Sequence, residues 1–208
     1  MSGNTKNVSP FDHKREKAVE IVYYPHPLLA RELKPVRKID QSLRDTVREM
    51  FDLMYQAEGV GLAANQVGLP IQLFVMNPTA DPDQPEEEQV FMNPIITRRF
   101  GEMRVVNEGC LSFPELRIDV ARPEGVEFRA INLKGEIVRN KWKGLRARIV
   151  QHESDHLFGI SFFKRADISG NINANNALEE MRERYRQALK EGTAVTEAQV
   201  DELLARQS

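Results

Sequence analysis

The clearest helical pattern in the chain lies between residues 41 and 57. Apolar residues recur there in steps of four, three, one and three, with charged residues largely on the opposite side, and the apolar set is Leu43, Val47, Met50, Phe51 and Met54. Asp40 is a suitable N-cap residue, and Gly59-Val60-Gly61 ends the pattern. We therefore predict an amphipathic helix from about Gln41 to Ala57.

The middle of the chain has a strand pattern instead. Ile71 to Met76 is an apolar run of the length of a buried strand. Asn77 to Gln89 contains three prolines and five acidic residues, which is typical of a solvated loop. Lys134-Gly135 indicates a hairpin turn. Short strands are predicted at residues 90–92, 94–100, 103–107, 116–120, 126–133 and 136–142.

Helical spacing returns after Gly144 and continues to Gly159, a plausible residue just beyond a helix end. A further helical pattern begins near Asn175. These elements predict an α+β fold in which a mostly antiparallel β-sheet packs around a central helix, with one N-terminal and one C-terminal helix. The expected organisation is a disordered tail over residues 1–17, one domain over 18–170 and a helical extension over 171–208.

Composition narrows the classes of partner. The 208 residues include 29 basic and 31 acidic ones, a net charge of −2, which gives no electrostatic reason to expect DNA or an anionic membrane as the main partner. No apolar run approaches the roughly 18–20 residues of a membrane span. The segment Met1 to Lys17 lacks the apolar core of a secretory signal, and a single cysteine allows no internal disulfide. A cytoplasmic protein is expected.

The central predicted helix carries the pattern H-E-x-x-H. His152 and His156 are four residues apart, so they lie on one helical face with Cβ atoms roughly 5–6 Å apart and can bind one metal ion. Glu153 points to a neighbouring sector, where it can act as a general base on a water at the metal. A catalytic metal normally needs a third protein ligand and one open position.

Cys110 is the best candidate for that third ligand. The other histidines are His13, in the predicted tail, and His26, between two prolines. A lone cysteine is usually a small buried apolar residue, but the histidine pair favours a metal ligand here. A thiolate and two neutral imidazoles would leave a divalent ion with a net charge of +1, able to lower the pKa of a bound water from about 15.7 to about 7. Zinc and iron(II) both suit these ligands.

The segment Gly59 to Gly68 has two interpretations. Gly59, Gly61 and Ala64 match a dinucleotide-binding fingerprint, G-x-G-x-x-G/A, and Asp81 follows at a suitable distance. That fingerprint requires a strand before the glycines and a helix after them, whereas here a helix precedes it. The alternative is a ledge of small residues that lets a peptide backbone approach, with the Gln66 amide as a donor to an oxyanion.

Three stretches together resemble the peptide deformylase family, metal-dependent hydrolases that remove the formyl group from the N-terminus of new polypeptides. They are G-x-G-L-A-A-x-Q at residues 59–66, E-G-C-L-S at 108–112 and Q-H-E-x-D-H-L at 151–157. The resemblance extends from about Val19 to Arg165, in the family's order.

The resemblance implies roles for individual residues. Cys110, His152 and His156 would hold the metal, which is usually iron(II) in cells, with zinc, nickel or cobalt able to replace it. Glu153 would be the general acid/base, and Gln66 with the Leu111 N–H would stabilise the oxyanion. The implied substrate-binding residues are Gly61 and Gly109, which would pair with an extended peptide, and Val60, Leu145 and Ile149, which would line a pocket for the methionine side chain together with His152.

Two other functions fit parts of the pattern. An H-E-x-x-H peptidase would need a ligand after the helix, and only acids such as Asp167 or Glu179 are available. A peptide-end binder without activity would need neither Glu153 nor Gln66. Both are weaker interpretations of the sequence. Arg148 differs from many relatives, which are apolar at that position, so the cleft is expected to differ in shape from theirs.

The C-terminal helical pattern carries Arg182, Arg186 and Lys190 at intervals of four residues. Such a stripe would allow transient contact with ribosomal RNA. Glu179, Glu180 and Glu183 interleave with it, however, which favours a solvated charged face.

Overall fold

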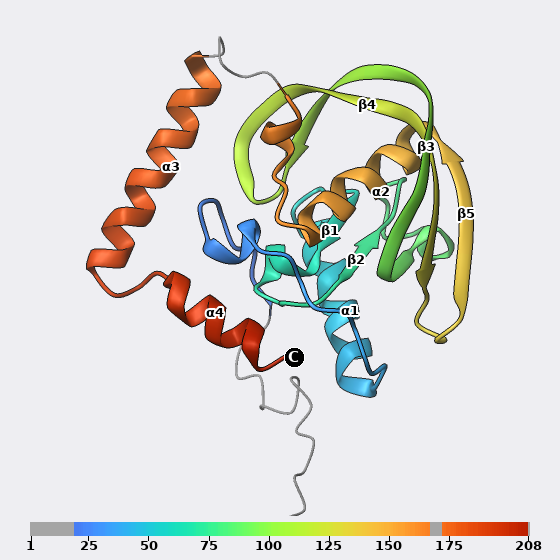
Figure 1. Ribbon diagram of the computed structural model, residues 1–208, viewed down its shortest axis with the longest axis horizontal. Helices are drawn as coiled ribbons and strands as arrows, with labels where there is room; N and C mark the ends of the chain where they lie inside the picture. Colours follow the sequence, from blue (N-terminus) through green and yellow to red (C-terminus); the bar gives the residue numbers. More distant parts are fainter. Residues whose placement is uncertain (1–18, 167–171, 208) are drawn as a thin grey trace, which may run out of the picture.

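A computed structural model describes residues 19–166 and 172–207 (Figure 1). In that part of the chain, one antiparallel sheet contains five strands in sequence order. They are β1 (Gly61–Ala63), β2 (Leu73–Met76), β3 (Gln89–Cys110), β4 (Phe113–Ile131) and β5 (Ile137–Lys143). The helices are α1 (Gln41–Gln56), α2 (Gly144–Leu157), α3 (Ile172–Lys190) and α4 (Glu197–Ala205), with 3-10 turns η1 (Pro27–Ala30), η2 (Ala64–Val67), η3 (Pro85–Glu87) and η4 (Phe162–Arg165).

The predicted α+β class is confirmed, and β2 explains how the layers are held together. Its four residues are all buried. Because strand side chains alternate between faces, Phe74 and Met76 pack in the core that contains α2, whereas Leu73 and Val75 pack in the core that contains α1. The sheet thus has apolar residues on both faces, and α2 lies within the curve of β3, β4 and β5 (Figure 1).

Helix α1 is the predicted N-terminal helix. The Asp40 carboxylate accepts a hydrogen bond from the Leu43 N–H at 3.0 Å, as expected of an N-cap. All five apolar residues of the predicted stripe are buried.

The prediction of several short strands was wrong in the middle of the chain. Residues 89–110 form one strand and residues 113–131 another, paired along nearly their whole length. The break predicted at Gly101 is a bulge between Phe100 and Met103, with Gly101 at φ +80°. A bulge bends a strand without ending it. The turn predicted at Lys134-Gly135 is present, with Gly135 at φ +82°.

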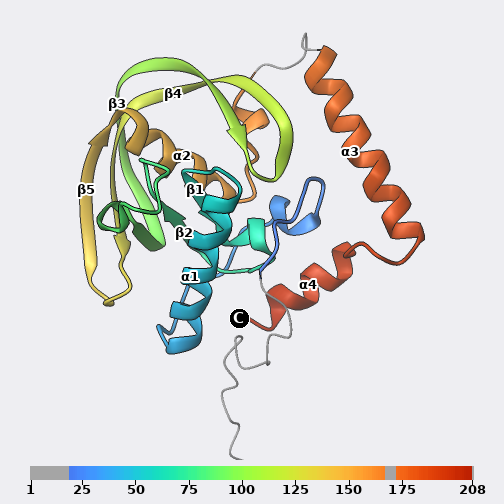
Figure 2. The same ribbon diagram turned by 180° about the vertical axis from the view of Figure 1, so that it is seen from behind.

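The C-terminal segment forms two helices, where one was predicted. Helix α3 buries Ala174, Leu178 and Met181 against residues of β4. Helix α4 begins at the N-cap Thr196 and buries Val200 in the core shared with Leu28. The two helices run along one side of the molecule, as both views show (Figures 1 and 2).

Some predictions fall outside the described residues. The tail predicted over residues 1–17 is one, and the boundary predicted near residue 170 is another. The domain limits therefore stay predictions. None of the helices that the structure describes has the length and apolar character needed to cross a membrane.

Gly159 fixes the end of α2 against η1. It lies at φ +68°, and a Cβ there would be 2.5 Å from the carbonyl carbon of Ala30. Gly144, at the other end of α2, has a similar φ of +64°, but a Cβ on it would meet no other part of the chain within 4 Å. Comparing Gly144 with Gly159 therefore separates the free-energy cost of a left-handed backbone from the cost of a side-chain collision with Ala30.

We predict that Gly144→Ala lowers the free energy of unfolding by about 1–2 kcal/mol, the cost of a left-handed residue with a side chain. Gly159→Ala should lower the free energy of unfolding by ~1–3 kcal/mol more than Gly144→Ala does, because the backbone of Ala30 must also move. Urea unfolding of both variants measures this difference. Equal losses in the two variants would contradict the proposed contact.

Candidate metal centre and cleft

Three side chains from two elements meet beside the sheet. Cys110 ends β3, and His152 and His156 lie one turn apart on α2. One ligand atom from each residue falls within 4.8 Å of the others, and Cys110 Sγ is 3.2 Å from His156 Nε2. Among the described residues no other group of potential ligands of this kind occurs.

The strand geometry turns Cys110 towards α2. Gly109 pairs with Arg117 on β4, whereas Cys110 pairs with Phe113, so the register shifts between neighbouring residues. An irregularity of this kind re-aims the side chain that follows it. The other histidine in the described residues, His26, accepts a hydrogen bond from the Leu28 N–H at the start of η1 and takes no part in the cluster.

Glu108 orients His152. Its Oε2 lies 3.0 Å from His152 Nδ1. Burial raises the pKa of Glu108, but hydrogen bonds with His152 and Arg122 bring it down to about 2. An ionised carboxylate only accepts, so the proton lies on Nδ1 and Nε2 is left to bind a metal when the ring is neutral. Carboxylate-bound histidines of this kind are typical of metal sites.

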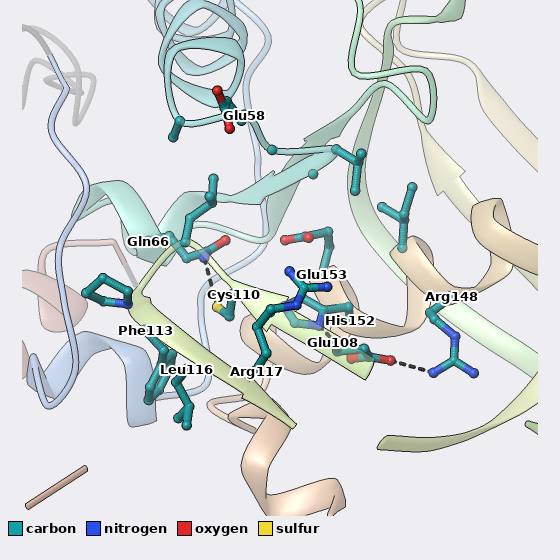
Figure 3. A pocket seen from close by; sticks show the side chains of 18 of the residues that line it. Glu58, Gln66, Glu108, Cys110, Phe113, Leu116, Arg117, Arg148, His152 and Glu153 are labelled. Atoms are coloured by element: carbon teal, nitrogen blue, oxygen red, sulfur yellow. Dashed lines mark hydrogen bonds and ion pairs between the residues drawn. The ribbon is translucent and has the colours of Figure 1, made fainter. Parts of the chain in front are cut away.

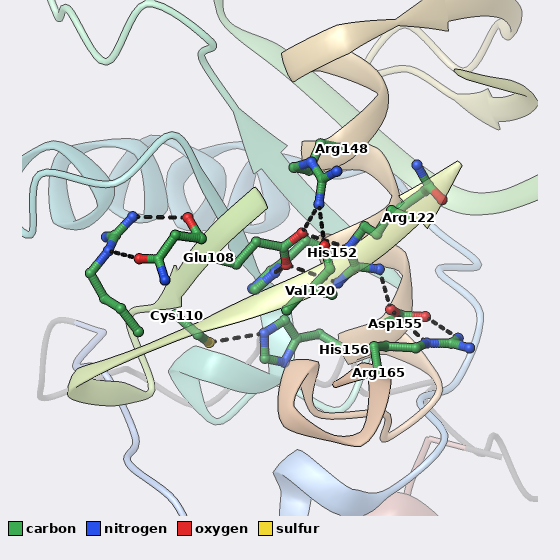
Figure 4. Close-up of polar contacts among 12 residues, drawn as sticks. Glu108, Cys110, Val120, Arg122, Arg148, His152, Asp155, His156 and Arg165 are labelled. Atoms are coloured by element: carbon green, nitrogen blue, oxygen red, sulfur yellow. Dashed lines mark hydrogen bonds and ion pairs between the residues drawn. The ribbon is translucent and has the colours of Figure 1, made fainter. Parts of the chain in front are cut away.

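A row of alternating charges continues from Glu108 along α2 (Figure 4). Arg122, which is only 3% exposed, donates to both Glu108 oxygens at 2.8 and 3.1 Å. It also donates to Asp155 at 2.7 Å, and Arg165 donates to both oxygens of Asp155. Each buried charge therefore has an opposite partner, which is the condition for burying ions without a large penalty.

The carboxylate of Glu153, unlike those of Glu108 and Asp155, has no arginine of the described residues hydrogen-bonded to it. Its carboxylate is buried, and its Oε2 has no hydrogen-bond partner in the protein. Burial raises the pKa of Glu153 to about 7, despite the opposing charges of His152 and Arg122. A Cβ on Gly61 would lie 2.5 Å from Glu153 Oε1, so the backbone of β1 passes directly against this carboxylate. A group with this pKa exchanges protons readily near neutral pH.

The Gln66 amide is fixed with its donor towards the cluster. Its Oε1 accepts a hydrogen bond from the Ala63 N–H at 2.8 Å. Its Nε2 consequently faces Cys110 Sγ at 3.4 Å and Ser112 Oγ at 3.3 Å. This amide is suited to donate to an oxygen beside Cys110.

A cavity of about 700 Å³ opens over these groups (Figure 3). Ile149 is buried in its wall and Leu145 is largely exposed. Every site residue predicted from the sequence lines this cavity except His156, which is 1% exposed and lies beneath it. The predicted residues on the wall are Val60, Gly61, Gln66, Gly109, Cys110, Leu111, Leu145, Ile149, His152 and Glu153.

The dinucleotide interpretation of the glycine segment is not supported. The glycines follow helix α1, and residues 61–63 form β1 while residues 64–67 form a 3-10 turn. A dinucleotide loop would have a strand before it and an α-helix after it. The segment instead forms one wall of the cavity, as the ledge interpretation predicts.

The sequence reasoning missed the residues that support the ligands. Glu108 stood in a recognised motif, two residues before Cys110, so its nearness to the proposed ligands could have been expected. Arg122 lies in a segment without a motif. Its partnership depends on the pairing of β3 with β4, which the sequence pattern does not reveal.

The two histidines differ in their affinity for protons. Burial alone lowers the pKa of His152, but hydrogen bonds with Cys110 and Glu108 raise it to about 10. Burial and the neighbouring His152 charge lower the pKa of His156 well below its usual value. The Nδ1 of His156 is also buried without a partner. A thiolate with two imidazoles, one already held by a carboxylate, fits a single divalent ion.

Comparison with known proteins gives consistent matches. Residues 18–171 match the family model described as polypeptide deformylase. A peptide deformylase of Rhodopirellula baltica is 42% identical over 180 residues, covering 86% of this chain and 89% of that protein. One from Aquifex aeolicus is 42% identical and covers 70% of this chain and 86% of its own length.

Solved structures agree with these sequence matches. A plant peptide deformylase 1B structure is 38% identical with a TM-score of 0.79, covering 83% of this chain and 93% of that one. A peptide deformylase of Synechococcus elongatus, solved in complex with actinonin, is 38% identical with a TM-score of 0.73, covering 79% and 89%.

The raised pKa of His152 predicts pH-dependent metal binding. Below about pH 10 the metal-free protein holds a proton on His152 that must leave before both imidazoles can act as neutral ligands. Affinity for Zn²⁺ should therefore rise with pH between 6.5 and 8.5, by up to about tenfold per pH unit for one released proton.

Competition titrations with a chelator of known affinity at each pH measure this slope. Glu108→Gln is the matched variant, because it removes one of the two hydrogen-bond partners, Cys110 and Glu108, that raise the pKa of His152, and its slope should be shallower. A pH-independent affinity in the unaltered protein would contradict the assignment.

Proposed function

The chain belongs to the polypeptide deformylase family, and from this premise we propose that Cys110, His152 and His156 hold the metal and that Glu153 moves the protons in the reaction. The protein is accordingly a hydrolase that removes the N-formyl group from the N-terminus of polypeptides and releases formate. The observation that carries the residue assignment is that the ligand atoms of Cys110, His152 and His156 lie within 4.8 Å of one another at the cavity that Glu153 lines, with Glu108 holding His152.

A divalent ion bound by these three ligands would polarise the formyl carbonyl and lower the pKa of a water in its open position. Glu153 accepts the proton of the attacking water and transfers it to the departing nitrogen as the carbon–nitrogen bond breaks. In the metal-free protein burial already raises the pKa of Glu153 to about 7, near the working pH at which a proton shuttle must bind and release the proton.

Oxyanion charge is proposed to be stabilised by Gln66 Nε2 and the Leu111 N–H. The Gln66 amide is already oriented by the Ala63 N–H, so no reorganisation is needed as charge develops. Such pre-oriented donors are among the larger contributors to catalysis.

The substrate is proposed to lie as an extended chain between the backbones of Gly61 and Gly109. The methionine side chain would enter the part of the cavity lined by Val60, Leu145 and Ile149. The close approach of Gly61 to Glu153 supports a narrow reacting end. A formyl carbon carries only hydrogen, so a narrow end would reject larger acyl groups.

The peptidase alternative has less support. Glu179, one of the downstream acids considered as a ligand, is ion-paired with Arg182 and Arg186 on α3 and is not in the ligand cluster. Asp167 lies outside the described residues. The inactive-binder alternative leaves the raised pKa of Glu153 without a use.

Three finer points complete the proposal. We propose iron(II) as the metal in cells, the cytoplasm as the compartment, where a thiolate ligand stays reduced, and formyl-methionyl nascent chains as substrates. Relatives from rice and Arabidopsis carry chloroplastic names, so the relatives as a group do not point to one compartment. Transient ribosome contact through α3 stays a weaker prediction, because Arg182 and Arg186 are ion-paired with glutamates.

We predict that Glu153→Ala retains its metal but loses activity by about 10²–10⁴-fold, the usual contribution of general acid/base catalysis. Formate release from a formyl-methionyl peptide and metal content per chain are the two measurements. Cys110→Ser is the contrasting variant, which should lose metal. Near-normal turnover by Glu153→Ala would show that another group moves the proton.

We also predict that protein purified without oxygen contains iron and loses activity in air, because iron(II) and its thiolate ligand are oxidised. Metal analysis beside the formate assay, before and after exposure to air, tests this. Replacement with nickel or zinc should give air-stable protein. Full activity of the iron-containing protein after long exposure to air would rule out iron as the working metal.

A further inference from the structure

Arg148 joins three elements at the edge of the cleft (Figures 3 and 4). From helix α2, its Nη1 donates to Glu108 Oε1 at 2.6 Å and to the Val120 carbonyl at 3.2 Å. Its Nη2 donates to the Arg104 carbonyl at 2.7 Å. The side chain is only 13% exposed, and its bonds to Glu108 and to the Val120 carbonyl are partly buried, whereas the bond to the Arg104 carbonyl is exposed.

The two carbonyls belong to opposite strands of the β3–β4 hairpin. Arg104 is on β3, and Val120 on β4 pairs with Val106. A single planar guanidinium therefore spans both strands and fixes them to α2. Only an arginine offers donors in this fixed fork, because a lysine concentrates its donors on one atom.

Glu108 receives hydrogen bonds from two sides. Arg122 donates to both of its oxygens and is itself held by Asp155 in the interior. Arg148 donates from the side of the cavity, whose wall it helps to form. The remaining bond of Glu108 goes to His152 Nδ1. Without Arg148, the carboxylate would keep both bonds from Arg122 but lose the second donor to Oε1, and with it one constraint on its orientation.

We propose that Arg148 is a positioning residue of the active site, which acts through Glu108 to hold the His152 ring in its metal-binding orientation. This proposal rests on the assignment of His152 as a metal ligand. Arg148 also locks the hairpin that carries Cys110 against the helix that carries both histidines. One side chain thereby couples the two elements that supply the ligands, and its loss should loosen the metal more than the fold.

A purely structural role is the alternative. In that case Arg148 would stabilise the hairpin without affecting the geometry of the ligands. The two roles predict different effects on a bound metal, so the metal itself is the best reporter. Cobalt(II) is suited to this purpose, because its visible absorption depends on the arrangement of its ligands.

The experiment compares Arg148→Met with the unaltered protein, both loaded with Co²⁺. We expect an altered visible spectrum and about tenfold faster release of Co²⁺ to a chelator, the lower end of the 10–100-fold range for residues that support metal ligands. Arg148→Lys should show a smaller change in spectrum and release rate than Arg148→Met, because its ammonium can keep the bond to Glu108.

Arg146→Met is the matched control. Arg146 lies on the same helix and is also ion-paired with a glutamate, Glu87, and stacked on Trp142. It has no contact with Glu108 among the hydrogen bonds and ion pairs of the described residues. Its Co²⁺ spectrum and release rate should match those of the unaltered protein.

An unchanged spectrum and release rate in Arg148→Met, with lower thermal stability, would overturn the proposal and leave only the structural role. If Arg148→Met does not fold, Arg148→Gln carries the same test, because it also removes the charge that faces Glu108. Faster release of Co²⁺ is expected from it, and an unchanged release rate would overturn the proposal. His152→Ala tests the ligand assignment of His152 separately from the positioning role of Arg148. Tight Co²⁺ binding by that variant would refute the ligand assignment itself, whatever Arg148 does.

Discussion

The site depends on the bond between the buried Glu108 carboxylate and His152. A carboxylate can be buried only if its charge is paired and its oxygens are hydrogen-bonded, and Arg122 and Arg148 meet that condition from two sides. Because Arg122 is held in turn by Asp155, the orientation of one ligand is determined by charges from β3, β4 and α2 together. The metal centre is therefore a product of the tertiary fold rather than of the H-E-x-x-H helix alone.

The sheet provides the rigidity that this arrangement needs. Strand β2 is buried on both faces, so α1 and α2 are held on opposite sides of one surface. The irregular register at Gly109 and Cys110 then turns the thiol towards α2. Small residues occupy the points where backbones approach the cleft. At Gly61 a side chain would collide with Glu153. The absence of a side chain keeps this part of the cleft open, and the closeness of the Gly61 backbone to Glu153 keeps it narrow.

The sequence predicted the parts of this structure that are encoded locally. Helix periodicity located α1 and α2, and motif spacing identified the three ligands that the structure brings together. It did not predict the length of β3 and β4, since Gly101 looks like a strand end and is a bulge. Nor did it predict that Arg122 and Arg148 bind Glu108, although it singled out Arg148 as a residue of the cleft, because these partners are brought near by the β3–β4 pairing. Long-range charge partners leave no periodic signal, whereas helical faces and adjacent ligands do.

Two buried carboxylates lie beside His152, and their surroundings give them different chemistry. Glu108 accepts four hydrogen bonds, three of them from arginines, and its pKa falls to about 2. Glu153 has an oxygen with no partner, and burial raises its pKa to about 7. In the metal-free protein Glu153 can therefore bind a proton near neutral pH, whereas Glu108 stays charged and keeps its hydrogen bond to His152. This difference agrees with the roles proposed for them, proton transfer for Glu153 and orientation of His152 for Glu108, and it arises without any difference in residue type.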